Sequence, residues 1–319
     1  MTPLRIGTRG SPLALWQAEH VAAAIAECGG PPTELVTIQT TGDRLSRAEI
    51  SETGGKRLFV KEIEDALVNG RIDLAVHSAK DLPAERLPAL TVSAALPRED
   101  PRDAVVARHP IRTDGDATPP TAILSPKSYR PRIGTGSIRR TAQLRHAFPN
   151  IDVAPVRGNI GTRLRKLDNG EFDLLVLATA GLVRLQLANR ITWRIPFDLC
   201  LPAPGQGIVA GEYRTEDSAT GDLLAALADR ETAAALEAER ALVTALGTDC
   251  QVPLGAIACP TNDDLVLRVV VASPDGAQLM TREARGPQHK ATELGTNVAQ
   301  LLIADGAEIL LRSARPIDG

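Results

Sequence analysis

The chain has 319 residues, of which 43% are hydrophobic and 24% are charged, so it is long and apolar enough for about two or three domains. Its 36 basic and 39 acidic side chains leave a formal net charge of -3, which excludes a protein-wide basic field for nucleic acid. Aromatic residues reach only 3%, too few for base-stacking platforms, so we expect no nucleic-acid partner.

The sequence predicts a cytoplasmic protein with no membrane partner. Arg5 and Arg9 interrupt the stretch that would be the apolar part of a signal peptide, and no apolar run reaches membrane length. No C-x-x-C pair occurs among the cysteines, which are Cys28, Cys200, Cys250 and Cys259. The histidines show no metal-ligand spacing, so we expect no metal site.

In chain order, the first predicted elements are a buried strand over Leu4–Thr8 and a helix that begins after Ser11. Ser11 supplies the N-cap and Pro12 the first helical residue, and the apolar positions from 15 to 25 follow helical spacing. The same local pattern returns at residues 133–137, followed by a helical stretch through Phe148. Each copy is a strand, a tight loop and a helix.

A second repeat is sharper, because residues 69–79 align without gaps on residues 169–179. Each segment contains a helix end, a glycine stop and a buried strand. Two matching α/β units predict two similar lobes around a cleft, with loops and helix N-termini at the carboxyl ends of the strands. The matched strands end differently, in Lys80–Asp81 and in Ala180–Gly181, which places the chemistry on the first lobe.

The last third of the chain predicts a separate small α+β domain. A strand-like segment over residues 208–213 returns to the first lobe, and a strong helix over 232–246 follows. Strands are then expected at 254–258, 265–272 and 278–281, and a final helix at 292–304. The predicted class is α/β, with a first lobe of residues 1–97 plus 207–226, a second lobe of 102–201 and a C-terminal domain of 230–319.

Basic residues gather in the loops that open the helices of both lobes. Free backbone N–H groups, the helix dipole and a guanidinium together make a carboxylate or phosphate site. The residues concerned are Arg9 and Ser11 in the first lobe, and Thr135, Ser137, Arg139, Arg140, Arg157, Gly158 and Arg163 in the second. Ordinary N-capping with surface arginines is the alternative for either loop alone, and the matching positions favour a ligand site.

Two further features point to chemistry. Lys80–Asp81 stands where a buried strand emerges, and a carboxylate beside cations can give and take protons. A surface salt bridge is the alternative, although the second lobe lacks the pair. Cys250 lies in a polar loop between a helix and a strand, where it is either a reactive thiol or an accidental surface thiol.

Several sequence blocks, taken together and in order along nearly the whole chain, resemble the porphobilinogen deaminase (hydroxymethylbilane synthase) family. These blocks are IGTRGSPLALWQA, GGKRLFVKEIEDAL, DLAVHSAKDLP, PREDPRDA, IGTGSIRRTAQL, VRGNIGTRLRKLDNGEFDLLVLATAGLVRL, LPAPGQG and GTDCQVPLGA. The resemblance implies two lobes like those of periplasmic anion-binding proteins and a third domain with a cysteine loop. It also implies a monomer.

The resemblance further implies a transferase of porphyrin and heme biosynthesis. Cys250 would hold one dipyrromethane cofactor through a thioether. Four porphobilinogen molecules would be deaminated and joined to it stepwise, and the linear tetrapyrrole would leave by hydrolysis. A non-catalytic two-lobed protein that binds carboxylate ligands is the alternative.

Site residues follow from the same resemblance, with Asp81 as the catalytic carboxylate and Lys80 assisting it. The expected cofactor ligands are Ser78, Lys80, Asp81, Thr135, Ser137, Arg139, Arg140, Arg157 and Gly158. The expected substrate ligands are Arg9, Ser11, Gln17, Lys56, Phe59, Arg98, Arg157, Arg163 and Arg184. Residues 43–56 are expected to form a flap over the cleft, with Lys56 and Phe59 at its base.

Overall fold

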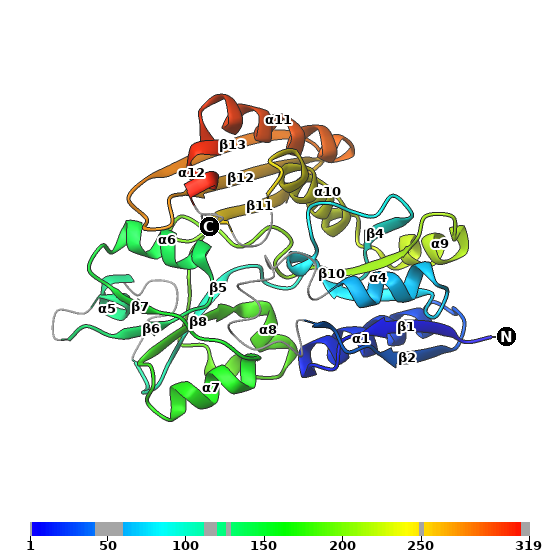
Figure 1. The fold of residues 1–319 in the computed structure, drawn as a ribbon, viewed down its shortest axis with the longest axis horizontal. Coiled ribbons are helices and arrows are strands. Elements are labelled where there is room, and N and C mark those ends of the chain that lie inside the picture. The colour runs from blue at the N-terminus through cyan, green and yellow to red at the C-terminus, as the bar shows by residue number, and fades with distance from the viewer. Residues whose placement is uncertain (1, 42–59, 112–119, 126–128, 249–251, 314–319) are drawn as a thin grey trace.

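The structure is a computed structural model that describes residues 2–41, 60–111, 120–125, 129–248 and 252–313. Three sheets organise these residues, and each sheet has its own helices (Figure 1). Within the described residues, no helix is long and apolar enough to cross a membrane. The expected flap at 43–56, with Lys56 and Phe59, lies outside the described residues, and so does Cys250.

The first sheet has the strand order β2-β1-β3-β10-β4. Strands β1, β2 and β3 are parallel, whereas β10 runs antiparallel between β3 and β4. Helices α1, α4 and α9 belong to this lobe. The bounds are β1 Leu4–Thr8, α1 Pro12–Glu27, β2 Thr33–Thr37, α4 Lys61–Val68, β3 Leu74–Ser78, β4 Leu90–Ala94, β10 Val209–Arg214 and α9 Ser218–Leu227.

The second sheet repeats this arrangement with the order β7-β6-β8-β5-β9, in which β5 is the antiparallel strand. Its elements are β5 Asp103–Ala107, α5 Pro120–Leu124, β6 Arg132–Gly134, α6 Ile138–Ala147, β7 Asp152–Ala154, α7 Ile160–Asp168, β8 Leu174–Ala178, α8 Thr179–Arg184, a 3-10 turn Ala188–Arg190 and β9 Trp193–Arg194. The predicted α/β class with two similar lobes is confirmed by these matching sheets.

The gapless repeat in the sequence is also confirmed. Asn69 and Asn169 are the C-caps of α4 and α7, and the glycines that follow adopt left-handed φ angles of +65° at Gly70 and +81° at Gly170. Strands β3 and β8 then begin at equivalent positions, and both are buried over their first four residues. Because each strand is covered on both faces, its apolar residues are consecutive rather than alternating, and only His77 of β3 breaks this pattern among the buried positions.

Two crossover segments join the lobes, and they lie side by side. The chain passes from β4 to β5 through residues 95–102 and returns from β9 to β10 through residues 195–208. The backbone N–H of Glu99 donates to the carbonyl of Gly207 at 3.1 Å, and the backbone N–H of Ile195 donates to the backbone carbonyl of Asp103 at 2.8 Å. The return of the chain to the first lobe, predicted from residues 208–213, is confirmed by β10.

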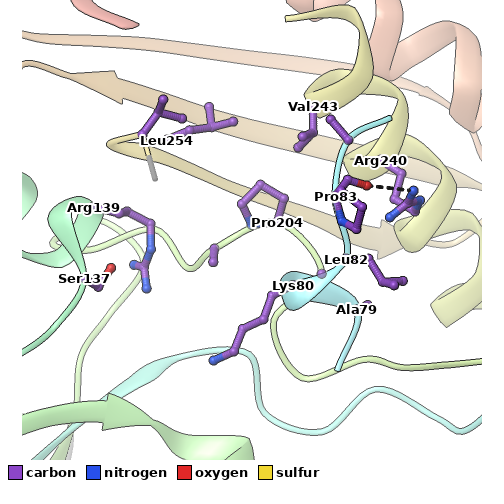
Figure 2. Close-up of a pocket in the computed structure, with 14 residues that line it drawn as sticks. Ala79, Lys80, Leu82, Pro83, Ser137, Arg139, Pro204, Arg240, Val243 and Leu254 are labelled. Atoms are coloured by element: carbon purple, nitrogen blue, oxygen red, sulfur yellow. Dashed lines mark hydrogen bonds between the residues drawn. The ribbon is translucent and has the colours of Figure 1, made fainter. Parts of the chain in front are cut away.

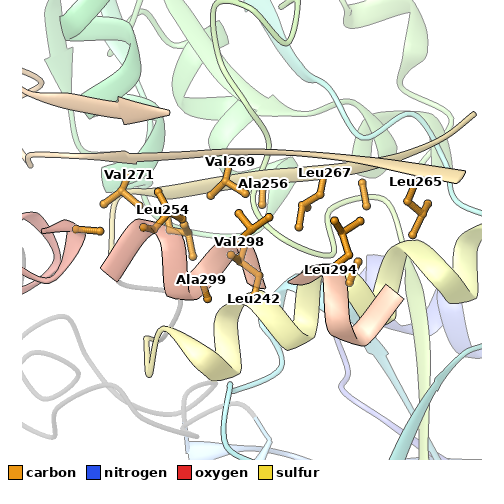
Figure 3. Close-up of a cluster of buried hydrophobic side chains, with 14 of the residues drawn as sticks. Leu242, Leu254, Ala256, Leu265, Leu267, Val269, Val271, Leu294, Val298 and Ala299 are labelled. Carbon is orange, nitrogen blue, oxygen red and sulfur yellow. The ribbon is translucent and has the colours of Figure 1, made fainter. Parts of the chain in front are cut away.

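The third sheet is antiparallel, with the order β11-β12-β13, and its inner face packs on two helices (Figure 3). Its core includes Leu242, Leu267 and Val298, which are completely buried. The elements are α10 Arg230–Ala245, β11 Leu254–Thr261, β12 Asp264–Ala272, β13 Leu279–Pro287, a 3-10 turn Gln288–Lys290, α11 Ala291–Ala304 and α12 Ala307–Ser313. The predicted helices over 232–246 and 292–304 are confirmed as α10 and α11.

Three details of this region differ from the prediction. Strand β11 was expected to end at residue 258 but continues to Thr261. Strand β13 was expected to end at residue 281 but continues to Pro287, and α12 was not expected. Strand β13 is an edge strand that pairs only with β12, and its burial pattern is mostly exposed. Charged residues such as Arg282 and Glu283 therefore replace the apolar alternation that marks a strand in a sequence.

Candidate active site

The Lys80–Asp81 pair lies in a short 3-10 turn, Ala79–Asp81, directly after β3. The backbone N–H of Ala79 donates to Ile208 at 3.0 Å, so the return crossover holds the turn in place. Asp81 is exposed, whereas Lys80 is half-buried and its Nζ donates to Oε1 of Gln206 at 3.3 Å. The carboxylate of Asp81 and the ammonium of Lys80 therefore lie at the end of β3, where the sequence predicted that a buried strand ends.

The environment of Lys80 favours the loss of its proton. Burial lowers the pKa of Lys80 to about 8, and the charges of Arg140 and Arg139 act in the same direction. The negative charges of Asp81 and Asp103 oppose this shift. Lys80 is therefore a cation whose charge is sensitive to its immediate partners.

Across the junction, a buried carboxylate holds two arginines of the second lobe. Asp103, the first residue of β5, accepts from Nη1 of Arg139 at 2.8 Å and from Nη2 of Arg140 at 2.7 Å. Burial alone would raise the pKa of Asp103, but the two guanidinium groups outweigh it and hold this pKa well below its usual range. The cluster carries a net positive charge in the folded protein.

Both arginines were expected to bind cofactor carboxylates, and the structure gives them protein partners as well. Arg139 donates to the carbonyl of Leu201 at 2.6 Å, and Arg140 donates to that of Val176 at 3.0 Å. Their Nε atoms are nevertheless buried with no hydrogen-bond partner among the described residues. Because a buried N–H without an acceptor is costly, these two donors suit an added carboxylate.

A pocket forms where the three sheets meet (Figure 2). Lys80 from the first lobe, Arg139 from the second and Arg240 from α10 contribute its positive charges. The guanidinium of Arg240 donates to the carbonyl of Pro83 at 3.2 Å, and burial lowers its pKa to about 10. Val252, the first described residue after Cys250, also lines the pocket. The pocket therefore brings cationic side chains from three domains together, and such groups suit the carboxylates of a ligand.

The other predicted residues of the second lobe lie in two loops. Ser137 caps α6, because its Oγ accepts the N–H of Arg140, and buried Thr135 accepts the N–H of Ser137 at 3.3 Å. Gly158 has a φ of +110°, and its carbonyl accepts from Nε of Arg163 at 2.7 Å. Burial and the charge of Arg140 lower the pKa of Arg163, and the charge of Asp81 opposes them.

Arg157 is exposed in the loop before α7. The ligand roles of these residues stay predictions.

In the first lobe, Ser11 caps α1 by accepting the N–H of Ala14 at 3.3 Å, and Arg9 is half-buried in the loop before it. Gln17 is buried on α1, and its Nε2 donates to Oγ of Ser78 at 2.9 Å. This bond ties the helix to the last residue of β3, next to Lys80. This hydrogen bond thus connects α1 to the end of β3, directly before the Ala79–Asp81 turn.

Two predicted substrate ligands have structural partners instead. Arg98 forms a two-point ion pair with buried Glu239 of α10, at 2.7 and 3.2 Å. Arg184 donates to the carbonyl of Gly207 at 2.7 Å, and its guanidinium lies 5.5 Å from the ring centroid of Trp16. Burial lowers the pKa of Arg184 to about 10, partly offset by the charge of Glu99. Substrate binding by Arg98 and Arg184 stays a prediction.

Sequence reasoning missed four residues that organise the site, namely Asp103, Gln206, Glu239 and Arg240. Asp103 and Gln206 stand in two of the quoted blocks, PREDPRDA and LPAPGQG, but only Arg98 was chosen from the first block and no residue from the second. A polar residue between two glycines, as in Gly205–Gln206–Gly207, was the available signal. Glu239 and Arg240 lie within an Ala- and Glu-rich helix, where charged residues are ordinary surface residues.

The fold and the site define a two-lobed α/β protein that gathers lysine and arginine around one Lys–Asp pair. Residues 4–222 match the family model "Porphobilinogen deaminase, dipyromethane cofactor binding domain", and residues 233–304 match "Porphobilinogen deaminase, C-terminal domain". Curated relatives named porphobilinogen deaminase, from two strains of Acidithiobacillus ferrooxidans, are 46% identical over 316 residues, which cover 98% of this chain and 98% of each relative. The chain belongs to the porphobilinogen deaminase family.

Two solved structures of binding proteins are similar to this chain at low sequence identity. Immunogenic lipoprotein A from Vibrio vulnificus is 14% identical, covering 72% of this chain and 96% of that chain, with a TM-score of 0.40. The amino acid transporter substrate-binding protein AbpA from Streptococcus pneumoniae, bound to L-arginine, is 11% identical, covering 70% of this chain and 86% of that chain, with a TM-score of 0.36. At these TM-scores the likeness carries no argument.

Proposed function

We propose that the protein is a hydroxymethylbilane synthase, a transferase that deaminates four porphobilinogen molecules and joins them head to tail. They are added to a dipyrromethane held covalently by Cys250, and water releases the linear tetrapyrrole. The observation that carries this proposal is that Lys80, next to Asp81, lines a pocket together with Arg139, Arg240 and Val252. Family membership over almost the whole chain supports the same reaction.

The chain's own residues divide the work. Lys80, Arg139 and Arg240 bind the acetate and propionate carboxylates, because guanidinium and ammonium groups form charge-assisted hydrogen bonds with them. The bound dipyrromethane supplies the free pyrrole carbon to which the first substrate is joined. The carboxyl of Asp81 gives a proton to the amine nitrogen, which leaves as ammonia, and then accepts the proton lost from the pyrrole carbon.

The exposed position of Asp81 suits this role, because substrate must reach it from solvent. Its carboxylate also stabilises the positive charge that develops on the substrate when ammonia leaves. The cations of the pocket hold the growing chain by its carboxylates and leave the reacting atoms beside Asp81. The second lobe has Ala180 and Gly181 at the matching positions, so it binds and does not relay protons.

We propose three domains with the boundaries predicted above, 1–97 plus 207–226, 102–201 and 230–319. The three separate sheets and the gap between the two family matches, from 222 to 233, support this division. We also propose that the enzyme is a cytoplasmic monomer. Cysteine usage supports the reducing compartment, because Cys28, Cys200 and Cys259 are free thiols.

The test is the intact mass of the purified, denatured protein beside that of its Cys250→Ser variant. We expect an excess equal to two linked pyrroles in the wild type and none in the variant. A wild-type mass equal to the bare sequence, together with no ammonia release from porphobilinogen, contradicts the proposal. That result favours the carboxylate-binding protein instead.

A second test concerns Asp81. Asp81→Asn should keep the fold and the cofactor mass but lower turnover by about 10²- to 10⁴-fold, because an amide cannot relay protons. Glu85→Gln is the matched control, since Glu85 is an exposed carboxylate on the same loop. Turnover of Asp81→Asn within threefold of Glu85→Gln removes Asp81 from the proposed role.

A further inference from the structure

Gln206 is a buried amide in the return crossover, and its position is determined from several sides. Its side chain is only 1% exposed. Its backbone N–H donates to Ala203 at 2.9 Å, and its carbonyl accepts from Nε of Arg98 at 3.0 Å. Gly205 and Gly207 on either side have φ angles of +74° and +88°, which glycine adopts freely. The backbone therefore presents the amide at one fixed place.

The orientation of this amide is decided by its partners. Its Nε2 donates to the carbonyl of Pro101 at 2.7 Å and to Oδ1 of Asp103 at 2.8 Å. Both partners are acceptors only, so the nitrogen must face them and the two N–H groups are used. Oε1 is left to face Lys80, whose Nζ lies 3.3 Å away. A reversed amide would place an oxygen against two acceptors.

We propose that Gln206 is a positioning residue for the reaction, which fixes Lys80 in the pocket and sets how readily Lys80 carries its proton. Its amide connects the ammonium of the first lobe to Asp103, the buried carboxylate of the second. The proposal rests on the proposed role of Lys80 in binding carboxylates, since only the charged form of Lys80 binds them strongly. Gln206 acts through Lys80 and touches no reacting atom.

The direction of the effect follows from electrostatics. Oε1 accepts a hydrogen bond from the ammonium, and an acceptor of this kind stabilises the charged form. The pKa of Lys80 is already lowered by burial and by Arg139 and Arg140, so the removal of Oε1 should lower it further. A hydrogen bond to a charged group is strong enough to change the proportion of neutral amine by about tenfold.

Gln206→Met tests the proposal, because methionine has a similar length and no amide. Gln143→Met is the matched control. Gln143 is also a buried glutamine that holds the return crossover, since its Nε2 donates to the carbonyl of Leu201 at 3.0 Å and its Oε1 accepts the N–H of Leu201 at 2.7 Å. Among the described contacts it makes none with Lys80. Both variants therefore remove side-chain hydrogen bonds that hold the return crossover, but only Gln206→Met removes a bond to Lys80.

The readout is reductive methylation with formaldehyde and cyanoborohydride, followed by peptide mass spectrometry at Lys80. Only the neutral amine reacts, so the rate against pH gives the midpoint for Lys80, and exposed Lys290 serves as the reference within each sample. The purified proteins are compared at equal cofactor loading, measured by intact mass. The labelling does not depend on turnover, so the failure of this proposal is distinguishable from the failure of the proposed function.

We expect Gln206→Met to react about threefold to tenfold faster at Lys80 near neutral pH, with a lower midpoint, and Gln143→Met to match the wild type. An unchanged midpoint in Gln206→Met overturns the proposal, even if the plateau rate rises, because a plateau change reports only loosened packing. An equal shift in Gln143→Met overturns it too. If Gln206→Met does not fold, Gln206→Asn, whose side chain is one methylene shorter, is tested in its place. We expect the same lowering of the Lys80 labelling midpoint, and an unchanged midpoint in this variant also overturns the proposal.

Discussion

Asp103 is the most sensitive electrostatic point of the site, and Asp103→Asn is the perturbation that isolates it. The carboxylate is completely buried and accepts from Arg139, Arg140 and Gln206 at 2.8, 2.7 and 2.8 Å. Asparagine keeps the shape but removes the negative charge. It also turns an NH2 group toward partners that are themselves donors. Two buried guanidinium groups then lose their counter-ion.

The expected cost follows from these contacts. Removing one partner of a buried ion pair destabilises a protein by about 3–5 kcal/mol, because the remaining charge is left uncompensated. Here each arginine keeps at least one protein acceptor. Arg139 keeps the carbonyl of Leu201 and the sulfur of Cys200, and Arg140 keeps the carbonyl of Val176. The cost should therefore lie near the lower limit, at about 3 kcal/mol.

Urea unfolding followed by tryptophan fluorescence measures this cost. Trp193 is buried in the second lobe and Trp16 is the other tryptophan, so a Trp16→Phe background reports on that lobe alone. Asp168→Asn is the control, because Asp168 pairs with Arg190 at 2.6 Å in the same lobe but on the surface, where a pair contributes about 0–1 kcal/mol. Equal destabilisation by the two variants would refute the reasoning.

The pH dependence has a definite sign. Burial opposes ionisation, but the two guanidinium groups keep the pKa of Asp103 below its value in the unfolded chain. The stabilisation by Asp103 is therefore complete above the unfolded-state pKa of about 3.9 and is lost as the pH falls below it. The difference between wild type and Asp103→Asn should stay constant between about pH 7 and pH 5 and shrink below about pH 4. Shrinkage already above pH 5 contradicts this account.

Two other predictions concern the crossover and the thiols. Gly207→Ala should destabilise the protein by at least about 1 kcal/mol more than the control Gly29→Ala. Both glycines have a positive φ, but only at Gly207 would an added Cβ clash with the carbonyl oxygen of Glu99. Equal melting temperatures of the two variants would contradict this. Burial raises the pKa of Cys200 to about 12, whereas Cys28 is exposed, so maleimide should label Cys28 in the native protein at neutral pH and Cys200 only after unfolding. Peptide mass spectrometry measures both, and native labelling of Cys200 would show that the buried cluster opens.

The repeated α/β units were predictable because their signals are local. In each lobe a helix end, a glycine with positive φ and a buried strand follow one another along the chain. The alignment of residues 69–79 on residues 169–179 was therefore enough to predict two similar lobes. The difference between the ends of these two strands is also local. It was the reason for predicting Lys80 and Asp81 as site residues. Strand β13 was only partly predictable, because an exposed edge strand needs no apolar alternation.

The partners of the arginines were not predictable, because they depend on contacts between distant parts of the chain. Arg139 and Arg140 resemble ordinary basic residues at a helix start, and only the folded chain brings Asp103 beneath them. Likewise, no residue near Arg98 in the sequence indicates that Arg98 pairs with Glu239, which lies on a helix of the third domain. The sequence shows which residues are charged, but whether a charged side chain is buried depends on tertiary packing.

The contacts of the return crossover explain how one site can be built from three domains. Glu239 accepts the N–H of Gly205 at 2.5 Å and binds Arg98 of the neighbouring crossover, so the third domain holds both crossovers. Gln206 then links this fixed point to Asp103 in the second lobe and to Lys80 in the first. A relative movement of the lobes must act on these few hydrogen bonds, because the crossovers are the covalent connections between the lobes. If Gln206 sets the charge of Lys80 as proposed, that charge depends on hydrogen bonds that join the two lobes.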